Sequence, residues 1–279
     1  MAELMIQEKI NVVILAAGKL SNQYWPKRYK ENPIWFSNFG NNSILQIISN
    51  KYDKDRYKLN VVYDEKNKNY NFQKFESFKN INNFINIEKT NSILETIFKS
   101  LNLFKNDEKL IFQVISLIPD NQNENIFPKA FLIDISKNHS QNGSWELISS
   151  KESCIEQYAL AGRILTTKKD LIDFFENYKF KKDEKLNTIA KFLLNEKGYK
   201  LNNINWIDIG HVETFNQSRI NYSISRSFNC IRFNKEKNTV IKESTNHKKL
   251  ESEYMYYQKL SPSIKNFYPR VFNYKKIKK

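Results

Sequence analysis

The segment Asn11–Lys19, which reads Asn-Val-Val-Ile-Leu-Ala-Ala-Gly-Lys, constrains the fold more than any other part of this sequence. A continuous apolar run of this length is typical of a strand in a parallel sheet that is covered on both faces. Gly18 follows the run, so backbone N–H groups there can approach phosphate oxygens without hindrance from a Cβ atom. The segment predicts a central strand with a phosphate-binding turn. A plain core strand followed by a turn glycine would have the same pattern.

A second segment, Trp206–Thr214, places Asp208 at the end of another predicted strand. A carboxylate in that position suits Mg²⁺, which takes oxygen ligands and neutralises the charge of a triphosphate. Asp208 is equally suited to cap a helix that we expect to begin near Val212, because Asp is favoured close to helix starts. The residues alone leave both interpretations open.

Apolar runs alternate with amphipathic stretches up to about residue 220, which is the pattern of an α/β sheet with helices on its faces. Strands are expected at Val12–Ala17, Lys58–Tyr63, Leu110–Ile118, Phe131–Ser136 and Trp145–Ser149. Helices are expected at Asn91–Phe104, Asp170–Tyr178 and Lys185–Lys197. Ser92 and Glu95 predict a capping box for the first helix, and Gly198 is expected to end the third.

The pattern changes after about residue 220. Phe228–Phe233 and Thr239–Lys242 predict a hairpin, and His247–Leu260 predicts a helix that Pro262 ends. This stretch is too short and too poor in apolar residues for an independent stable domain, so we expect it to pack on the first domain or to be a fragment. The sequence therefore divides into domains at 1–220 and 221–279.

Composition narrows the function classes. The formal net charge is +15, but lysines are spread among acidic residues rather than clustered, which argues against a nucleic-acid binder. Hydrophobic residues at 40% exclude a wholly disordered chain. The two cysteines, Cys154 and Cys230, show no metal-ligand spacing, so we expect a cytoplasmic protein. No stretch predicts a membrane span, and Glu3 and Glu8 precede the first apolar run, unlike a signal peptide.

The order of motifs resembles that of the sugar-phosphate nucleotidyltransferases, and the resemblance covers most of the chain. It is strongest to the two-part proteins of bacterial capsule loci, which join such a domain to a choline- or aminoglycoside-kinase-like phosphotransferase. Leu15–Lys19 resembles the family's phosphate-binding loop. Ser150–Lys151, followed by Ala161–Gly162, resembles a passage near the acceptor sugar phosphate. Trp206–Gly210 resembles the Trp-x-Asp-x-Gly motif, which supplies a metal-binding acid.

The resemblance implies a Rossmann-like, mixed but mostly parallel sheet with helices on both faces, of the GT-A-like kind, followed by a small α+β piece. It implies Mg²⁺-dependent transfer of a nucleotidyl group from a nucleoside triphosphate, CTP or UTP, to a sugar phosphate or similar phosphorylated acceptor. Pyrophosphate is released, and the product serves capsule or surface-polysaccharide synthesis. Positioning and charge neutralisation would carry such a reaction. An oligomer is compatible with this assignment.

The resemblance also implies roles for individual residues. The nucleotide phosphates are assigned to the turn formed by Ala16, Ala17, Gly18 and Lys19. Lys27 or Arg28 is expected to neutralise the outer phosphates of the nucleotide. Lys151 is expected to bind the acceptor phosphate. The acceptor also approaches Gly162, and the metal is assigned to Asp208 and Asp120.

Some positions depart from the family pattern. Leu20 and Asn22 stand where the family has a second glycine and an arginine, and Val114–Leu117 stands where its first metal-binding acid is expected. Asp120, a few residues further, is the expected substitute. The departures motivate an alternative hypothesis, in which the protein is a non-catalytic nucleotide-binding or partner subunit of the same pathway.

The end of the chain has its own resemblance. Ser225–Asn229 resembles the phosphate-covering loop of the kinase-like domain, Lys242 resembles its strand lysine, and Glu251 or Glu253 resembles the helix partner of that lysine. Nothing similar to a catalytic loop follows. The resemblance implies only the beginning of a kinase lobe, which could not phosphorylate a substrate by itself.

Overall fold

The computed structural model shows that the chain forms two compact units, Met1–Ser218 and Arg219–Lys279. The structure describes residues 9–17, 35, 38–39, 42–64, 78, 80–119, 131–136, 147–149, 157–176, 178–181, 184–212, 214–215, 218, 229–234, 237, 239–268, 270–271 and 273–275.

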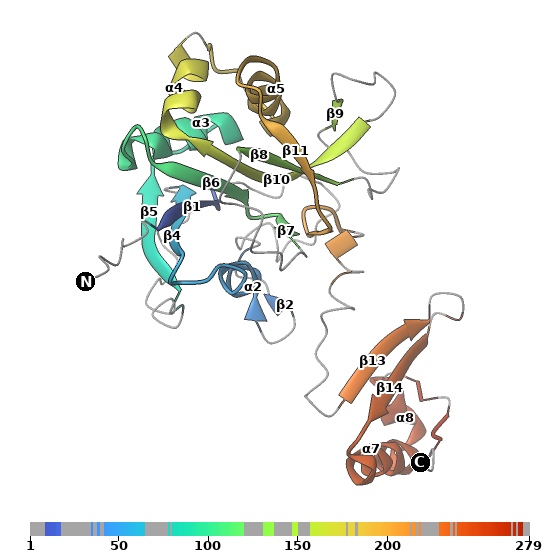
Figure 1. Ribbon diagram of the computed structural model, residues 1–279. Coiled ribbons are helices and arrows are strands. Elements are labelled where there is room, and N and C mark those ends of the chain that lie inside the picture. The colour runs from blue at the N-terminus through green and yellow to red at the C-terminus, as the bar shows by residue number, and fades with distance from the viewer. Residues whose placement is uncertain are drawn as a thin grey trace, which may run out of the picture. The chain divides into compact units, whose positions relative to one another are not determined.

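A mixed eight-stranded sheet forms the centre of the first unit (Figure 1). Its strands are Ile10–Leu15 (β1), Tyr57–Asp64 (β4), Ile81–Ile87 (β5), Lys109–Val114 (β6), Leu132–Ser136 (β8), Leu147–Ser149 (β9), Gln157–Thr167 (β10) and Lys200–Asn203 (β11). The order is β11-β8-β10-β6-β1-β4-β5, with β9 paired to β10. Parallel pairing joins β5, β4, β1 and β6, and also β8 and β11, whereas β10 runs antiparallel to its neighbours. The expected Rossmann-like, mostly parallel sheet is therefore confirmed.

Strand β1 lies between two parallel partners, which explains its apolar sequence. Val13 is paired with Asn60 of β4 on one side and with Phe112 of β6 on the other. The side chains from Val12 to Ala16 are buried on both faces of the sheet. A strand in this position reads as a continuous apolar run rather than an alternating one, because water reaches neither face.

Helices cover both faces of the sheet (Figure 1). On one face lie Ile93–Ser100 (α3), Lys168–Glu176 (α4) and Leu186–Glu196 (α5), whose apolar side chains form one core cluster with residues of β1, β6, β8 and β10. On the other face lies Ile44–Ser49 (α2), which buries most of its residues and was not predicted. Helix α5 stops before Gly198, which has a φ of 67° and was expected to end it.

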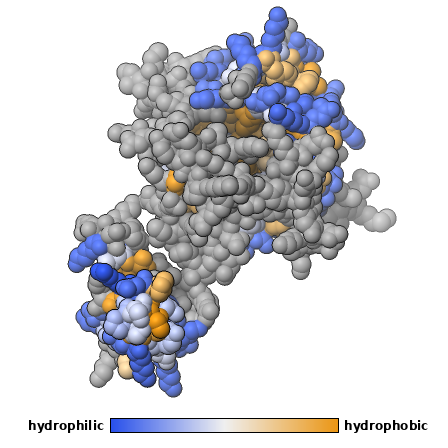
Figure 2. All heavy atoms as spheres, turned by 180° about the vertical axis from the view of Figure 1, so that it is seen from behind, coloured by the Kyte–Doolittle hydropathy of each residue, from blue (hydrophilic) through white to orange (hydrophobic). Residues whose placement is uncertain are grey.

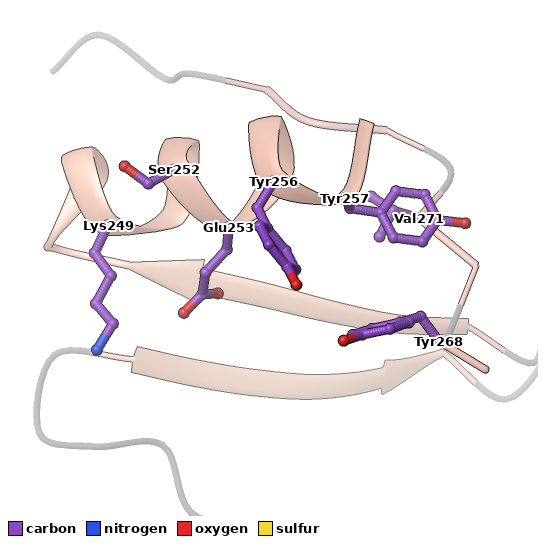
Figure 3. Close-up of a pocket in the computed structure, with 7 residues that line it drawn as sticks. All are labelled: Lys249, Ser252, Glu253, Tyr256, Tyr257, Tyr268 and Val271. Carbon is purple, nitrogen blue, oxygen red and sulfur yellow. The ribbon is translucent and has the colours of Figure 1, made fainter. Parts of the chain in front are cut away.

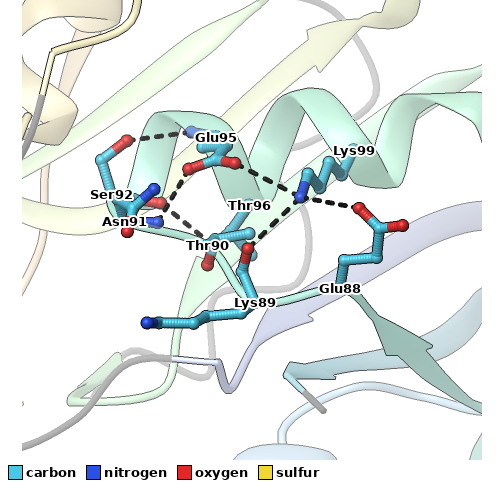
Figure 4. Close-up of polar contacts among 8 residues, drawn as sticks. All are labelled: Glu88, Lys89, Thr90, Asn91, Ser92, Glu95, Thr96 and Lys99. Carbon is cyan, nitrogen blue, oxygen red and sulfur yellow. Dashed lines mark hydrogen bonds and ion pairs between the residues drawn. The ribbon is translucent and has the colours of Figure 1, made fainter.

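The start of helix α3 is held by a polar cluster (Figure 4). The Ser92 hydroxyl accepts a hydrogen bond of 3.1 Å from the Glu95 N–H, as the sequence predicts. The Glu95 carboxylate does not return this bond to Ser92, but accepts from the Asn91 N–H at 2.7 Å and pairs with Lys99 at 3.3 Å. Only half of the expected capping box is therefore present. The Asn91 N–H, assisted by Lys99, holds the pKa of Glu95 below its usual value.

The predicted strand Leu110–Ile118 is divided in the structure. Strand β6 ends at Val114, the chain turns, and Leu117–Pro119 forms a separate strand, β7. Strand β7 pairs antiparallel with Trp206–Asp208 (β12) in a two-stranded ribbon apart from the main sheet. The sequence did not reveal the turn, because buried apolar residues stand on both sides of Ser116. A second small ribbon joins Asn38–Phe39 (β2) and Asn42–Ser43 (β3).

The second unit contains the expected hairpin and helix. Asn229–Asn234 (β13) pairs antiparallel with Thr239–Ser244 (β14), and His247–Lys259 (α7) follows. Pro262 does not merely end this helix but begins a further short one, Pro262–Lys265 (α8), because proline is favoured at the first helical position.

Apolar side chains remain exposed on the second unit, and helix α7 has no buried residue. Figure 2 shows apolar spheres on the visible face of this unit. The exposed large apolar residues are Val240, Ile241, Met255, Tyr256, Ile264, Phe267, Tyr268 and Val271. Within the described residues of the whole chain, no helix is long and apolar enough to span a membrane.

A buried ion pair crosses the antiparallel part of the main sheet. Arg163 of β10 pairs with Asp134 of β8, and their side chains are only 9% and 1% exposed. Asn202 of β11 donates a hydrogen bond of 2.7 Å to the other carboxylate oxygen of Asp134. Burial raises the pKa of Asp134, and the Arg163 guanidinium opposes this change.

This pair yields a test of the fold. Arg163→Met should lower the free energy of unfolding by about 3–5 kcal/mol, because it leaves a buried carboxylate without its counter-charge. The double variant Asp134→Leu/Arg163→Met should recover most of that loss, because apolar side chains of similar size remove both charges. Urea unfolding at neutral pH measures both changes. A double variant no more stable than the single one would contradict this account.

Candidate active site

At the carboxyl end of β1, the chain leaves the sheet between the two parallel strands β4 and β6. The Ala16 N–H donates to the Val62 carbonyl of β4 at 2.8 Å, and the Leu15 carbonyl accepts from the Ile115 N–H at 3.3 Å, just beyond β6. Ala16 is fully buried, and Ala17 is 7% exposed. These small residues allow the chain to pass closely between β4 and β6 at the carboxyl edge of the parallel strands, where ligands bind in open α/β sheets.

Asp208 lies at the same edge. Leu15 is paired with Val114 at the end of β6, and three residues later Leu117 begins β7 and is paired with Asp208. The Ile209 N–H continues the ribbon by donating to the Ser116 carbonyl at 3.0 Å. The tertiary structure therefore brings the carboxyl end of β1 and the acid of β12 to one edge, although nearly two hundred residues separate them.

The Asp208 carboxylate is held by the residues that follow it. One oxygen accepts from the Gly210 N–H at 2.8 Å. The other accepts from the Thr214 hydroxyl and lies 2.8 Å from His211 Nδ1. The Phe215 N–H donates to the His211 carbonyl at 2.8 Å, so a helical turn begins here. These contacts order the loop that follows β12, but none of them is a bond from a helix N–H group, so the capping and the metal-binding interpretations of Asp208 both stay predictions.

The donor set at Asp208 is compatible with Mg²⁺. This ion is usually held by one or two carboxylates together with substrate phosphates and water, rather than by a complete protein cage. A carboxylate offers about four lone-pair positions, and the three local donors leave one of them for a metal. No group of three or more His, Cys, Asp or Glu side chains is arranged for metal binding among the described residues.

Gly162 has a left-handed backbone conformation within strand β10. It has a φ of 69°, and the pairing of β10 with β8 shifts register between Leu160 and Ile164. A Cβ atom on Gly162 would lie 2.7 Å from Leu117 Cδ1 and 3.1 Å from Val114 Cβ. Gly162 therefore lets β10 approach the chain that carries β7. Its predicted contact with the acceptor stays a prediction.

The remaining predicted site residues all lie outside the described residues. They are Gly18, Lys19, Lys27, Arg28, Asp120 and Lys151. Their roles at the triphosphate, the metal and the acceptor stay predictions.

Sequence reasoning missed a second acid at this edge, Asp64. It ends β4, immediately beside β1, and is 2% exposed. The signal was an acid directly after the apolar run Val61–Tyr63, at a position that was expected only to end the strand. Asp64 and Asp208 come from opposite sides of β1, because β4 and β6 flank that strand.

A further contact belongs to the second unit by itself. Lys242 of β14 forms an ion pair with Glu253 of α7. Of the two glutamates expected as its partner, Glu253 is the one that contacts it. A cleft beside this pair is lined by Lys249, Ser252, Glu253, Tyr256, Tyr257, Tyr268 and Val271. Figure 3 shows Lys249, Glu253 and Tyr256 pointing from α7 toward the hairpin.

Comparisons with known proteins give a consistent result at the level of the fold. No family model and no curated protein sequence matches the chain. A solved structure from Bacillus anthracis, assigned as a glucose-1-phosphate thymidylyltransferase, matches with a TM-score of 0.63 and 12% identity, over 78% of this chain and 96% of that one. The inositol-1-phosphate CTP transferase of T. maritima matches with a TM-score of 0.60 and 14% identity, over 77% and 96%. A nucleoside-diphosphate-sugar pyrophosphorylase from Vibrio cholerae RC9 matches with a TM-score of 0.57 and 14% identity, over 75% and 99%.

Two glycines with positive φ among the described residues provide a matched test of the site. Gly162→Ala and Gly198→Ala both place a Cβ on a left-handed backbone, but only the Cβ at Gly162 meets neighbouring atoms within 4 Å. Gly162→Ala should therefore lower the free energy of unfolding by about 1–3 kcal/mol more than Gly198→Ala does. Urea unfolding measures the difference. Equal losses would show that the close approach of β10 to β7 is unimportant.

Proposed function

We propose that this protein transfers a nucleotidyl group from a nucleoside triphosphate to a sugar phosphate or a similar phosphorylated acceptor, with Mg²⁺. An oxygen of the acceptor phosphate attacks the α-phosphorus, and the bond from that phosphorus to the oxygen bridging to the β-phosphate breaks. Pyrophosphate leaves with the electron pair of that bond. The observation that carries the proposal is the meeting of the β1 carboxyl end with Asp208 at one sheet edge.

The names of the structural neighbours support the same reaction class. They include a thymidylyltransferase for glucose 1-phosphate, a CTP transferase for inositol 1-phosphate and a nucleoside-diphosphate-sugar pyrophosphorylase. Each of these names couples a nucleotide to a sugar or polyol. The acceptors share a phosphate on a polyhydroxylated ring, which is the acceptor class that we propose here.

The residue roles follow from position and charge. We assign the triphosphate to the backbone N–H groups of Ala16, Ala17, Gly18 and Lys19. Lys27 or Arg28 neutralises the outer phosphates, and Lys151 holds the acceptor phosphate, close to Gly162. Asp208 and Asp120 hold Mg²⁺, which neutralises the charge that develops on the phosphates. CTP and UTP are the nucleotides that we expect.

The cellular role is a separate proposal. We place the reaction in the cytoplasm, where nucleoside triphosphates are made, and in the supply of activated precursors for capsule or surface polysaccharide. The Lys242–Glu253 pair supports reading 221–279 as the beginning of a kinase-like lobe, because such a pair orients a lysine toward nucleotide phosphates. The exposed apolar side chains of this unit are consistent with a larger folded assembly around it.

One observation favours the alternative hypothesis of a non-catalytic subunit. Both Asp208 oxygens already accept hydrogen bonds from groups within six residues of the carboxylate, at Gly210, His211 and Thr214. A carboxylate that serves only to order its own loop would show the same contacts. Activity and binding measurements separate the two hypotheses.

Activity is tested with each labelled nucleoside triphosphate, Mg²⁺ and a panel of sugar and polyol phosphates. At least one combination of nucleoside triphosphate and acceptor should release pyrophosphate. With that combination, Asp208→Asn should lower kcat/KM at least about 100-fold, because a lost metal ligand removes several kcal/mol of charge stabilisation. The control is Asp173→Asn, which removes a partly exposed acid of helix α4 that pairs with Lys197 at the end of α5. It should change kcat/KM less than about twofold. A folded protein without turnover on the whole panel would contradict the proposed activity.

Binding is tested by titration calorimetry with CTP and UTP. The enzyme hypothesis predicts binding that requires Mg²⁺ and that Asp208→Asn weakens by about tenfold or more, because the carboxylate links the metal to the protein. The Asp173→Asn control should bind as the unchanged protein does. A non-catalytic partner subunit predicts no binding, or binding that neither Mg²⁺ nor the Asp208 substitution alters.

A further inference from the structure

A fully buried glutamine connects the main sheet to the β7–β12 ribbon. Gln113 lies in β6, next to Val114 at the strand end, and its side chain is shielded from water. Its Nε2 donates to the Val114 carbonyl at 2.8 Å and to the Leu117 carbonyl at 2.6 Å. The two bonds span the turn between β6 and β7. The turn is therefore closed by a side chain and not by strand pairing alone.

The orientation of this carboxamide is fixed by its surroundings. Both acceptors on the Nε2 side are carbonyls, so a rotated amide would direct its own oxygen at two other oxygens. On the opposite side, the Tyr52 hydroxyl donates to Gln113 Oε1 at 3.3 Å. Burial raises the pKa of Tyr52, so this hydroxyl keeps its proton. Only one orientation satisfies all of these groups.

The groups behind Tyr52 are also buried and charged. Burial raises the pKa of Tyr52, and the Arg163 guanidinium opposes this change by its charge and a side-chain hydrogen bond. Arg163 is in turn paired with Asp134. Arg163 is also the residue of β10 that is paired with Gln113 in the sheet. A polar network therefore runs from β8 through β10 to β6 and supports the amide from behind.

The ribbon depends on this support. Strands β7 and β12 form a two-stranded sheet of their own, and an isolated pair of strands is marginally stable in water. Leu117, whose carbonyl Gln113 holds, is the residue paired with Asp208. The strand pairing therefore links the position of the Asp208 backbone to that of Leu117, and the hydrogen bond from Gln113 links Leu117 to β6.

We propose that Gln113 is a positioning residue, which holds the Leu117 carbonyl and thereby places the Asp208 carboxylate at the site edge. The inference rests on the proposed function for its kinetic consequence, but its structural consequence can be measured without any activity. Gln113 contacts no substrate. It acts through the β7–β12 ribbon.

Asn60 provides a matched control. It is a buried carboxamide, 2% exposed, on the neighbouring central strand β4. Its Nδ2 contacts Asn11 and the carbonyls of Val12 and Lys58, and its Oδ1 accepts from Asn83. None of these partners belongs to the ribbon. Gln113→Met and Asn60→Leu each remove a buried amide, keep most of its volume and should lower thermal stability.

The structural test follows amide hydrogen exchange by NMR in both variants. Ile209 donates to Ser116 and Gly210 donates to Asp208, so their N–H groups report on the ribbon. The two variants are compared at urea concentrations that give them the same free energy of unfolding. Under these conditions, exchange at both N–H groups should be about tenfold faster in Gln113→Met than in Asn60→Leu. Equal exchange at Ile209 and Gly210 in both variants would overturn the proposal.

The kinetic test uses the same pair. Gln113→Met should lower kcat more than it raises KM for the nucleotide, and should raise the Mg²⁺ concentration for half-maximal rate, because Asp208 is displaced. Asn60→Leu should change neither once rates are corrected for folded protein. If the unchanged protein lacks turnover, the proposed function fails, while the exchange measurement still decides the role of Gln113. If Gln113→Met does not fold, Tyr52→Phe takes its place. We then expect faster exchange at the same two amides. Unchanged exchange would contradict the proposal.

Discussion

The parallel pairing of β1 with β4 and β6 is the constraint on which the rest of the first unit depends. It buries β1 on both faces, which requires an apolar sequence from Val12 to Ala16 and helices on either side of the sheet. It also brings the carboxyl ends of three strands to one edge. The small residues at the end of β1 and the acid Asp64 of β4 meet there as a direct consequence.

The second acid, Asp208, reaches this edge by a less regular route. The chain turns after β6 and forms β7, and β12 returns from far along the sequence to pair with it. Gly162 leaves room for that turn, and Gln113 closes it. The geometry of this edge therefore involves a buried glycine and a buried amide that lie behind the turn. Burial of the Gln113 amide is offset by its two hydrogen bonds, which join the main sheet to the chain of the ribbon.

Several elements were predictable from the sequence because their signals are local. The apolar runs gave β1, β4 and β8, the periodic face of α3 and its Ser92 cap gave that helix, and Gly198 gave the end of α5. Other elements were not predictable for equally physical reasons. Strand β5 is half-buried and rich in asparagine, and the turn between β6 and β7 has apolar residues on both sides. The reciprocal half of the capping box failed because Glu95 bonds to Asn91 instead of Ser92.

The sequence by itself determined the α/β class, the central strand and the candidate acid Asp208, because strand burial, glycine turns and strand-end acids leave patterns within a few residues. The tertiary structure alone decided that the end of β1 and Asp208 share one sheet edge, that Glu253 is the partner of Lys242, and that Gln113, Tyr52, Arg163 and Asp134 form one network. These are relations between residues distant in the chain. Strand order and register create them, and neither is encoded in local periodicity.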